Sequence, residues 1–257
     1  MNEFNAKKTT EELINWIRSW FDENGKDCNA VLGVSGGKDS NIVAALCVKA
    51  LGKNRVIGVS MPNTLQQVKK EQFKDDECVE KLINHLGIKF LKVDIGSIYE
   101  QVLINFCKAT HWEPTMSGQA KTNLSPRLRM SVLYAVSQSF NGRVVNTDNL
   151  SENYVGYFTK WGNVGDFSPL ANLTVSEVKA IGRELGLPNE LIDRVPSDGL
   201  CGKTDEDNLG FSYEILDKYI RTGICENAEI KEKIDKKHND NLFKFKPVAS
   251  FKNVIYD

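Results

Sequence analysis

The sequence lacks long hydrophobic runs, an excess of either charge, and closely spaced cysteines, and each absence argues against a class of protein. No apolar stretch is long enough to cross a bilayer, and the first eight residues lack the apolar core of a signal peptide. Acidic and basic residues nearly balance, at 34 and 33, so net charge gives no reason to expect a nucleic-acid-binding protein. We therefore expect a cytoplasmic protein with neither a membrane nor a nucleic acid as its partner.

The six cysteines are far apart in the sequence, and no Cys-x-x-Cys pair suggests a metal or redox site. Cys47 and Cys107 fall in apolar helical patterns, so we expect buried thiols rather than metal ligands or disulfides.

At 257 residues the chain can bury a substantial core, and no repeat, low-complexity tract or obvious linker divides it. We expect residues 1–257 to form a single domain.

One short segment near the N-terminus has the features of a phosphate-binding loop. Residues 30–34 are an apolar run typical of a buried strand, and the run breaks at Ser35-Gly36-Gly37, where a helix follows. Glycines permit close approach of a ligand, and the helix N-terminus with its flanking serine hydroxyls can bind an anion. Lys38 adds positive charge, and Asp39 can supply an oxygen ligand to a magnesium ion that accompanies pyrophosphate.

Strands and helices alternate along most of the chain. The expected strands are 30–34, 55–60, 89–94 and 143–147; the expected helices are 9–21, 38–50, 75–86, 97–109, 125–140, 174–185, 211–222 and 227–237. This order predicts an α/β fold with a doubly wound parallel sheet, helices on both faces, and a ligand at the carboxyl ends of the strands. Two polar stretches with little periodicity, 148–169 and 196–207, are typical of functional loops.

The loop Ser35-Gly-Gly-Lys-Asp-Ser40 lacks the spacing of a Walker A motif and resembles the pyrophosphate loop of the ATP pyrophosphatases. That superfamily includes NAD synthetase, GMP synthetase, asparagine synthetase, argininosuccinate synthetase and tRNA-thiolating enzymes. The resemblance implies an adenine nucleotide alpha hydrolase-like fold, cleavage of ATP between its α and β phosphates, and adenylylation of a substrate oxygen.

Three further segments resemble NAD synthetases in particular. They are Asn123-x-x-x-Arg-x-Arg-Met-x-x-x-Tyr134, the block from Asn146 to Leu170 with its Gly-Tyr-Phe-Thr-Lys-Trp-Gly162 core, and Pro196 to Tyr213. The resemblance implies a homodimer that adenylylates the nicotinate carboxylate of deamido-NAD with ATP. Ammonia then displaces AMP to give NAD, and Mg²⁺ assists the ATP.

The resemblance also implies roles for individual residues. The ATP-binding residues would be Gly33, Val34, Ser35, Gly36, Gly37, Lys38, Asp39, Ser40, Thr147 and Ser197. The residues that bind deamido-NAD would be Arg127, Lys160, Asp166 and Lys244. Asp39 and Glu152 would bind the metal, and with Asp166, which can hold or deprotonate ammonium, they would form the catalytic set. Arg129 points away from the helical face of Arg127, which leaves a purely structural pairing open.

Two positions depart from the pattern of the family. Many members carry an ATP-binding lysine where this chain has Val175, and Lys179 lies one turn later as a possible substitute. The tail reads Phe243-Lys244-Phe245 instead of His-Lys-Arg, so only Lys244 matches. His238 could replace the histidine, but between lysines at a helix end we interpret it as solvated.

Other functions remain open on the sequence. The phosphate loop begins about thirty residues in, which leaves no room for a preceding glutaminase domain, so we expect free ammonia unless a separate subunit supplies it. The nearest alternatives are the ATP domain of a GMP synthetase, a tRNA thiolase and a nucleotide sensor without catalysis. A thiolase should have paired reactive cysteines and a basic face, and two metal carboxylates argue against a pure sensor.

Overall fold

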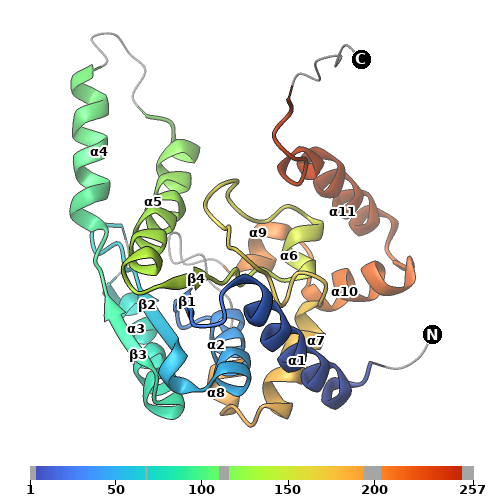
Figure 1. The fold of residues 1–257 in the computed structure, drawn as a ribbon. Helices are drawn as coiled ribbons and strands as arrows, with labels where there is room; N and C mark the ends of the chain where they lie inside the picture. The colour runs from blue at the N-terminus through green and yellow to red at the C-terminus, as the bar shows by residue number, and fades with distance from the viewer. Residues whose placement is uncertain (1–3, 67–68, 110–115, 194–203, 251–257) are drawn as a thin grey trace, which may run out of the picture.

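The structure is a computed structural model that describes residues 4–66, 69–109, 116–193 and 204–250 (Figure 1). The strands are β1 Asn29–Gly33, β2 Val56–Ser60, β3 Lys89–Lys92 and β4 Gly142–Val144. The α-helices are α1 Ala6–Asn24, α2 Lys38–Leu51, α3 Lys69–Leu86, α4 Gly96–Ala109, α5 Gly118–Ser139, α6 Leu150–Tyr154, α7 Val175–Glu184, α8 Asn189–Ile192, α9 Asp205–Leu209, α10 Tyr213–Thr222 and α11 Ala228–Asn241. Short 3₁₀ turns are η1 Lys53–Arg55 and η2 Leu242–Lys244.

The described strands form one parallel sheet in the order β3-β2-β1-β4, which confirms the predicted doubly wound fold. Ala30 of β1 is in register with Val56 of β2 on one side and with Arg143 of β4 on the other. The chain adds strands outward from β1 to β3 and then returns to the opposite side of β1. The winding direction therefore reverses between β1 and β4, and the crevice at the carboxyl ends of these two strands is where such folds bind ligands.

Helices cover both faces of the sheet because successive strand residues point to opposite sides. Ala30 and Leu32 face a core shared with α1, α2 and α7, whereas Val31 faces a second core under α5. A third apolar cluster forms beyond the sheet, where Val155, Leu209 and other residues join α6, α7, α9, α10 and α11. This third cluster places the C-terminal helices α10 and α11 beside α6 and α7 (Figure 1).

Several sequence expectations need correction. The fourth strand ends at Val144 rather than at residue 147, since Val145 forms only an isolated bridge with Phe167. The stretch 148–169 contains the short helix α6. Cys47 is buried as expected, but Cys107 is exposed, on the part of α4 that extends beyond the sheet (Figure 1). None of the helices in the described ranges is long and apolar enough to span a membrane.

Candidate active site

The loop between β1 and α2 has a defined backbone geometry. Gly36 has a φ of +78°, which a glycine adopts without strain, and Gly37 caps α2. The Ser40 hydroxyl donates to the carbonyl of Gly37 at 2.9 Å, and the Gly37 amide donates to the Ser35 hydroxyl at 3.2 Å. From α3, the Cys78 thiol donates to the carbonyl of Gly36 at 3.2 Å. These contacts hold the loop in place at the predicted phosphate-binding position.

A buried ion cluster lies at the start of α2. The Lys38 side chain is only 2 % exposed, and its Nζ lies 2.8 Å from Asp39 Oδ2 and 3.9 Å from Glu152 Oε1. Burial alone would lower the pKa of Lys38, but the charges of Asp39 and Glu152 outweigh it and raise the pKa above its usual value. Burial and the neighbouring Asp39 raise the pKa of Glu152 well above its usual range. The structure thus brings together the two acids that were predicted to bind one metal ion.

Glu152 reaches this cluster from α6, which a buried carboxylate ties to its neighbours. The Ser151 hydroxyl donates to Asp217 Oδ1 at 2.5 Å and accepts from the Val175 amide at 3.1 Å. The other oxygen of Asp217 accepts from the Ser176 amide at 2.7 Å. Asp217, on α10, is not marked by any sequence motif, because its partners come from α6 and α7. Val175 itself is buried in the third core, and Lys179 lies 3.9 Å from Asp193.

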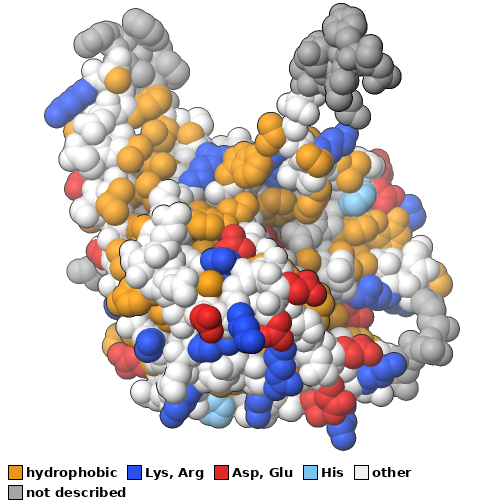
Figure 2. Space-filling model, in the orientation of Figure 1, with side chains coloured by type: hydrophobic (Ala, Val, Ile, Leu, Met, Phe, Trp, Pro, Cys, Tyr) orange, Lys and Arg blue, Asp and Glu red, His pale blue; other side chains and the backbone are white. Residues whose placement is uncertain are grey.

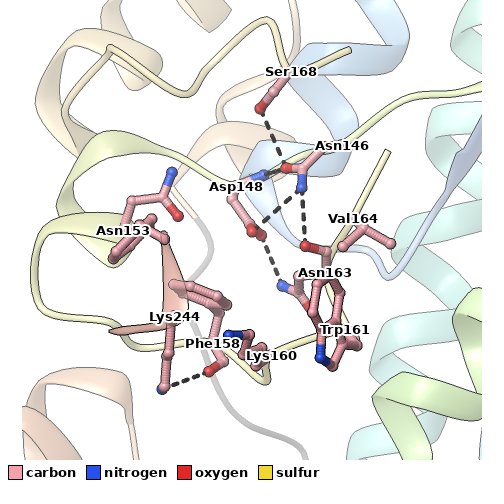
Figure 3. A pocket seen from close by; sticks show the side chains of 11 residues that line it. Asn146, Asp148, Asn153, Phe158, Lys160, Trp161, Asn163, Val164, Ser168 and Lys244 are labelled. Atoms are coloured by element: carbon pink, nitrogen blue, oxygen red, sulfur yellow. Dashed lines mark hydrogen bonds between the residues drawn. The ribbon is translucent and has the colours of Figure 1, made fainter. Parts of the chain in front are cut away.

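Next to the cluster is a hollow of about 210 Å³ with a polar end and an aromatic end (Figure 3). Its polar wall includes Asn146, Asp148 and Asn163, and its other wall includes Phe158 and Trp161. Lys160 and Lys244, both predicted to bind the acceptor nucleotide, line it as well. The hollow has the mixed apolar and polar lining that is typical of small-molecule sites.

Asp148 is a buried acid of this hollow that the sequence pattern does not single out. It accepts hydrogen bonds from Asn163 at 2.7 Å and from Asn146 at 3.5 Å (Figure 3). Burial, with a smaller contribution from the charge of Asp39, raises the pKa of Asp148 to about 6 against these hydrogen bonds. The one signal in the sequence is its place directly after Thr147, at the carboxyl end of the fourth predicted strand.

This shift predicts a pH-dependent effect of Asp148→Asn. A carboxyl group whose pKa is higher in the folded than in the unfolded state costs stability once the pH exceeds its usual pKa of 3.8. We expect the stability gain of Asp148→Asn over wild type to grow by about 2 kcal/mol between pH 4.5 and pH 7.5 in urea unfolding. Asp94→Asn is the control: hydrogen bonds from Thr64 and Gly96 outweigh burial and lower the pKa of Asp94, so its contribution to stability is lost only below its usual pKa of 3.8. The stability difference between Asp94→Asn and wild type should therefore stay nearly constant between pH 4.5 and pH 7.5. An equal pH dependence of stability in both variants would contradict the raised pKa of Asp148.

The residues predicted to bind deamido-NAD lie in two places. Arg127 and Lys160 are adjacent, with Arg127 Nε donating to the Lys160 carbonyl at 3.3 Å, and the Lys160 amine donates to the Phe243 carbonyl at 3.2 Å. Asp166 is exposed and accepts from the Val144 amide at 2.7 Å and the Tyr134 hydroxyl at 3.4 Å. These contacts tie the Asp166 carboxylate to β4 and α5.

The remaining predicted residues are placed as follows. Thr147 is half-buried and lies three residues after the end of β4, directly before Asp148. Ser197 lies outside the described residues. Arg129 donates to the Met61 carbonyl at 2.9 Å, which confirms the structural alternative for this side chain.

The C-terminal helix and tail bind the loop that follows α6 through a row of backbone carbonyls. His238 Nδ1 donates to the Tyr154 carbonyl at 2.7 Å, and its ring stacks on Tyr154, so the interpretation of His238 as a solvated residue is wrong. The Lys244 amine donates to the carbonyls of Gly156 at 2.6 Å and Phe158 at 2.9 Å (Figure 3). Lys244, predicted as a nucleotide ligand, therefore holds this loop in the structure.

Gly156 is the tightest point of this contact. It has a φ of +64°, and a Cβ added there would lie 2.2 Å from the Cβ of Asn241. We expect Gly156→Ala to lower the free energy of unfolding by about 3 kcal/mol in urea titration, because it combines backbone strain with a clash. Gly186→Ala is the matched control: its φ is +76° but nothing lies within 4 Å, so it should cost only about 1 kcal/mol. Equal losses would mean that the tail is not packed against this loop.

Comparisons with known proteins agree with the geometry. The sequence model described as NAD synthase matches residues 9–253. The NH(3)-dependent NAD(+) synthetase of Methanococcus aeolicus is 43% identical over 221 residues, which cover 84% of this chain and 82% of that protein. The NMN synthetase structure from Francisella tularensis has a TM-score of 0.86 at 32% identity, over 98% of this chain and 100% of that one. The NH3-dependent NAD synthetase structure from Campylobacter jejuni has a TM-score of 0.73 at 26% identity, over 97% and 100%. With its phosphate loop, its paired acids and these relatives, the chain belongs to the NAD synthase family.

Proposed function

We propose that this protein is an ammonia-dependent NAD synthetase, a ligase that uses ATP to amidate deamido-NAD and releases AMP and pyrophosphate. The observation that carries this conclusion is the cluster of Lys38, Asp39 and Glu152 at the switch point of the sheet, in a chain of the NAD synthase family. A carboxylate accepts ammonia only after one of its oxygens becomes a good leaving group. Adenylylation supplies that leaving group, and it requires a held pyrophosphate and a site that excludes water.

A magnesium ion fits the two carboxylates. Mg²⁺ usually takes one or two protein carboxylates and completes its shell with phosphate oxygens and water. Asp39 and Glu152 converge on the positive charge of Lys38, so their oxygens face one region of the cluster. Among the described residues, no group of three His, Cys, Asp or Glu side chains could hold a metal alone, which agrees with a metal that arrives with ATP. When bound, the ion would offset the charge of the leaving pyrophosphate.

We assign the ammonia side of the reaction to the polar end of the hollow. Asp166 is the acid that the family resemblance suggests for holding or deprotonating ammonium, and it remains a candidate, although it is exposed and is not among the residues that line the hollow. Asp148 is a second one, because it is buried in the hollow and its pKa of about 6 allows it to hold or release a proton near neutral pH. Measuring the KM for ammonium in Asp148→Asn and in Asp166→Asn separates the two candidates. Only the substitution of the acid that contacts ammonium should raise this KM.

A second acceptor, nicotinic acid mononucleotide, is favoured by one comparison and one contact. The structure named NMN synthetase resembles this chain with a TM-score of 0.86, against 0.73 for the Campylobacter NAD synthetase. The amine of Lys244, expected to bind the dinucleotide, is instead bound to two backbone carbonyls. Both acceptors present the same nicotinate carboxylate, so the chemistry of adenylylation is unchanged.

One experiment tests the proposed function and its competitor together. Pyrophosphate release is measured with MgATP and ammonium in the presence of deamido-NAD, nicotinic acid mononucleotide, XMP or no acceptor, with the amidated product followed in parallel. We expect release that depends on deamido-NAD and equals the NAD formed. A higher kcat/KM for the mononucleotide would make the protein an NMN synthetase, and release only with XMP would reject both.

We also propose that free ammonia is the nitrogen source, so glutamine in place of ammonium should give no product.

We further propose that the protein works as a homodimer through α4 and α5. Hydrophobic side chains gather on the arm that these helices form (Figure 2), and Ile98 and Ile104 of α4 are 43 % and 39 % exposed. An exposed apolar surface of this kind is typical of protein interfaces. Ile104→Glu should shift sedimentation toward the monomer, whereas Ile224→Glu, at an exposed position after α10, should not.

We also propose that the protein works in the cytoplasm. It would use ATP, and the cysteines in the described part of the chain are free thiols, as is usual in that compartment.

A further inference from the structure

The two predicted metal-binding acids are joined by a side chain that no sequence motif assigns. Asn149 precedes α6 and is 0 % exposed. Its Oδ1 accepts a hydrogen bond from the backbone amide of Glu152 at 3.0 Å. Its Nδ2 donates to Asp39 Oδ1 at 3.3 Å. One amide group thus contacts the helix that carries one acid and the carboxylate of the other.

The contact leaves the charge of the acid pair unchanged. Asp39 Oδ2 is bound by Lys38 at 2.8 Å, and Asp39 Oδ1 is bound by Asn149, so both oxygens of this carboxylate have a nitrogen donor. Two like charges held close together repel each other. A neutral amide can orient Asp39 against that repulsion without cancelling the negative charge that attracts a cation.

The short helix α6 cannot easily move to compensate for a lost contact. Ser151, the residue before Glu152, is fully buried and bound to Asp217 and to the Val175 amide. The helix is therefore held at its N-terminus by Asn149 and along its buried side by Ser151. With α6 held in this way, the orientation of Asp39 relative to Glu152 depends directly on the amide of Asn149.

We propose that Asn149 is a positioning residue that sets the separation of Asp39 and Glu152, so that both carboxylates reach one divalent cation bound with ATP. This inference rests on the proposed function for the identity of the nucleotide. In this role Asn149 does not contact the substrate, and it does more than cap a helix.

Serine and threonine at position 149 separate these two roles. Both residues cap a helix about as well as asparagine, but neither is long enough to reach Asp39 from the same backbone position. Threonine also fills nearly the same volume, so it guards against a cavity that could unfold the Asn149→Ser variant. Asn227→Ser is the matched control, because the side-chain oxygen of Asn227 caps α11 by accepting from the amides of Glu229 and Ile230, within the helix that it caps.

The primary measurement is binding of Mn²⁺, followed by electron paramagnetic resonance, in the presence of α,β-methylene-ATP, which is not cleaved between its α and β phosphates. Mn²⁺ prefers the same oxygen ligands as Mg²⁺. We expect Asn149→Ser and Asn149→Thr to bind Mn²⁺ about tenfold more weakly than wild type, in line with the loss of one hydrogen bond to a charged group. Their kcat should fall by a similar factor, with the KM for the acceptor nucleotide unchanged. Their thermal midpoints should fall, because the same hydrogen bond is lost from the folded protein. Asn227→Ser should match wild type in Mn²⁺ affinity, kcat and KM.

Two results would overturn the proposal. One is wild-type affinity for Mn²⁺ in both Asn149 variants, whether or not their thermal midpoints fall, because Asn149 would then act as a cap only. The other is a wild-type protein that binds no Mn²⁺ with the ATP analogue. Loss of Mn²⁺ affinity in the variants of a protein that amidates no nicotinate nucleotide would instead reject the proposed function and leave the role of Asn149 intact.

Discussion

Asp39→Asn and Glu152→Gln should each lower kcat by about a thousandfold while the protein stays folded. Each change replaces a carboxylate by a neutral amide at the place where a magnesium ion would meet the pyrophosphate, and such an ion contributes several kcal/mol to stabilising the transition state. The stability should change little, because removing one acid also removes its repulsion with the other. Steady-state rates of pyrophosphate release and urea unfolding measure both effects.

The pH dependence provides a sharper check on Glu152. Its pKa is raised in the folded protein by burial and by Asp39, so its charge costs stability above its usual pKa, and the cost is lost as the pH falls. Glu152→Gln should therefore be at least as stable as wild type at pH 8, with a smaller advantage at pH 5. Wild-type rates in both variants would reject the metal assignment. A fall in stability of Glu152→Gln at pH 8 would contradict the electrostatic account of the cluster.

Lys38→Met should have the opposite effect on stability. The ammonium is almost completely buried and faces both acids, so its removal leaves two carboxylates without their nearest positive charge. Breaking a buried ion pair in this way costs about 3–5 kcal/mol, and methionine preserves most of the packing. We expect a loss of this size at pH 8, a smaller loss at pH 5, where Glu152 takes up a proton because its pKa is raised, and a fall in kcat of at least a hundredfold.

Lys179→Met is the matched control for this prediction. Lys179 also lies beside a carboxylate, at 3.9 Å from Asp193, but both side chains are substantially exposed. An exposed pair contributes less than about 1 kcal/mol, so this variant should be close to wild type at both pH values. If the two lysine variants lose similar stability, Lys38 does not hold the acids together. An equal loss for Lys38→Met at pH 5 and pH 8 would instead mean that its packing, and not its charge, stabilises the fold.

The sequence was sufficient for features that depend on neighbouring residues. The alternation of apolar strands and amphipathic helices follows from local periodicity, and it led to the parallel sheet and the order of its elements. The phosphate loop was recognisable because Gly36, Lys38 and Asp39 are adjacent in the chain. Such features need no knowledge of which elements pack against each other.

Only the tertiary structure decided which side chains meet across the fold. The contact of Lys38 with Glu152, and that of Asn149 with Asp39, join segments far apart in the chain. Lys244 matched a family position, but the packing of α11 against the loop after α6 directs its amine to two carbonyls. Periodicity shows which face of a helix is apolar but not what covers that face, which is why Cys107 was expected to be buried and is exposed. Burial and long-range pairing depend on three-dimensional contacts that a local pattern does not contain.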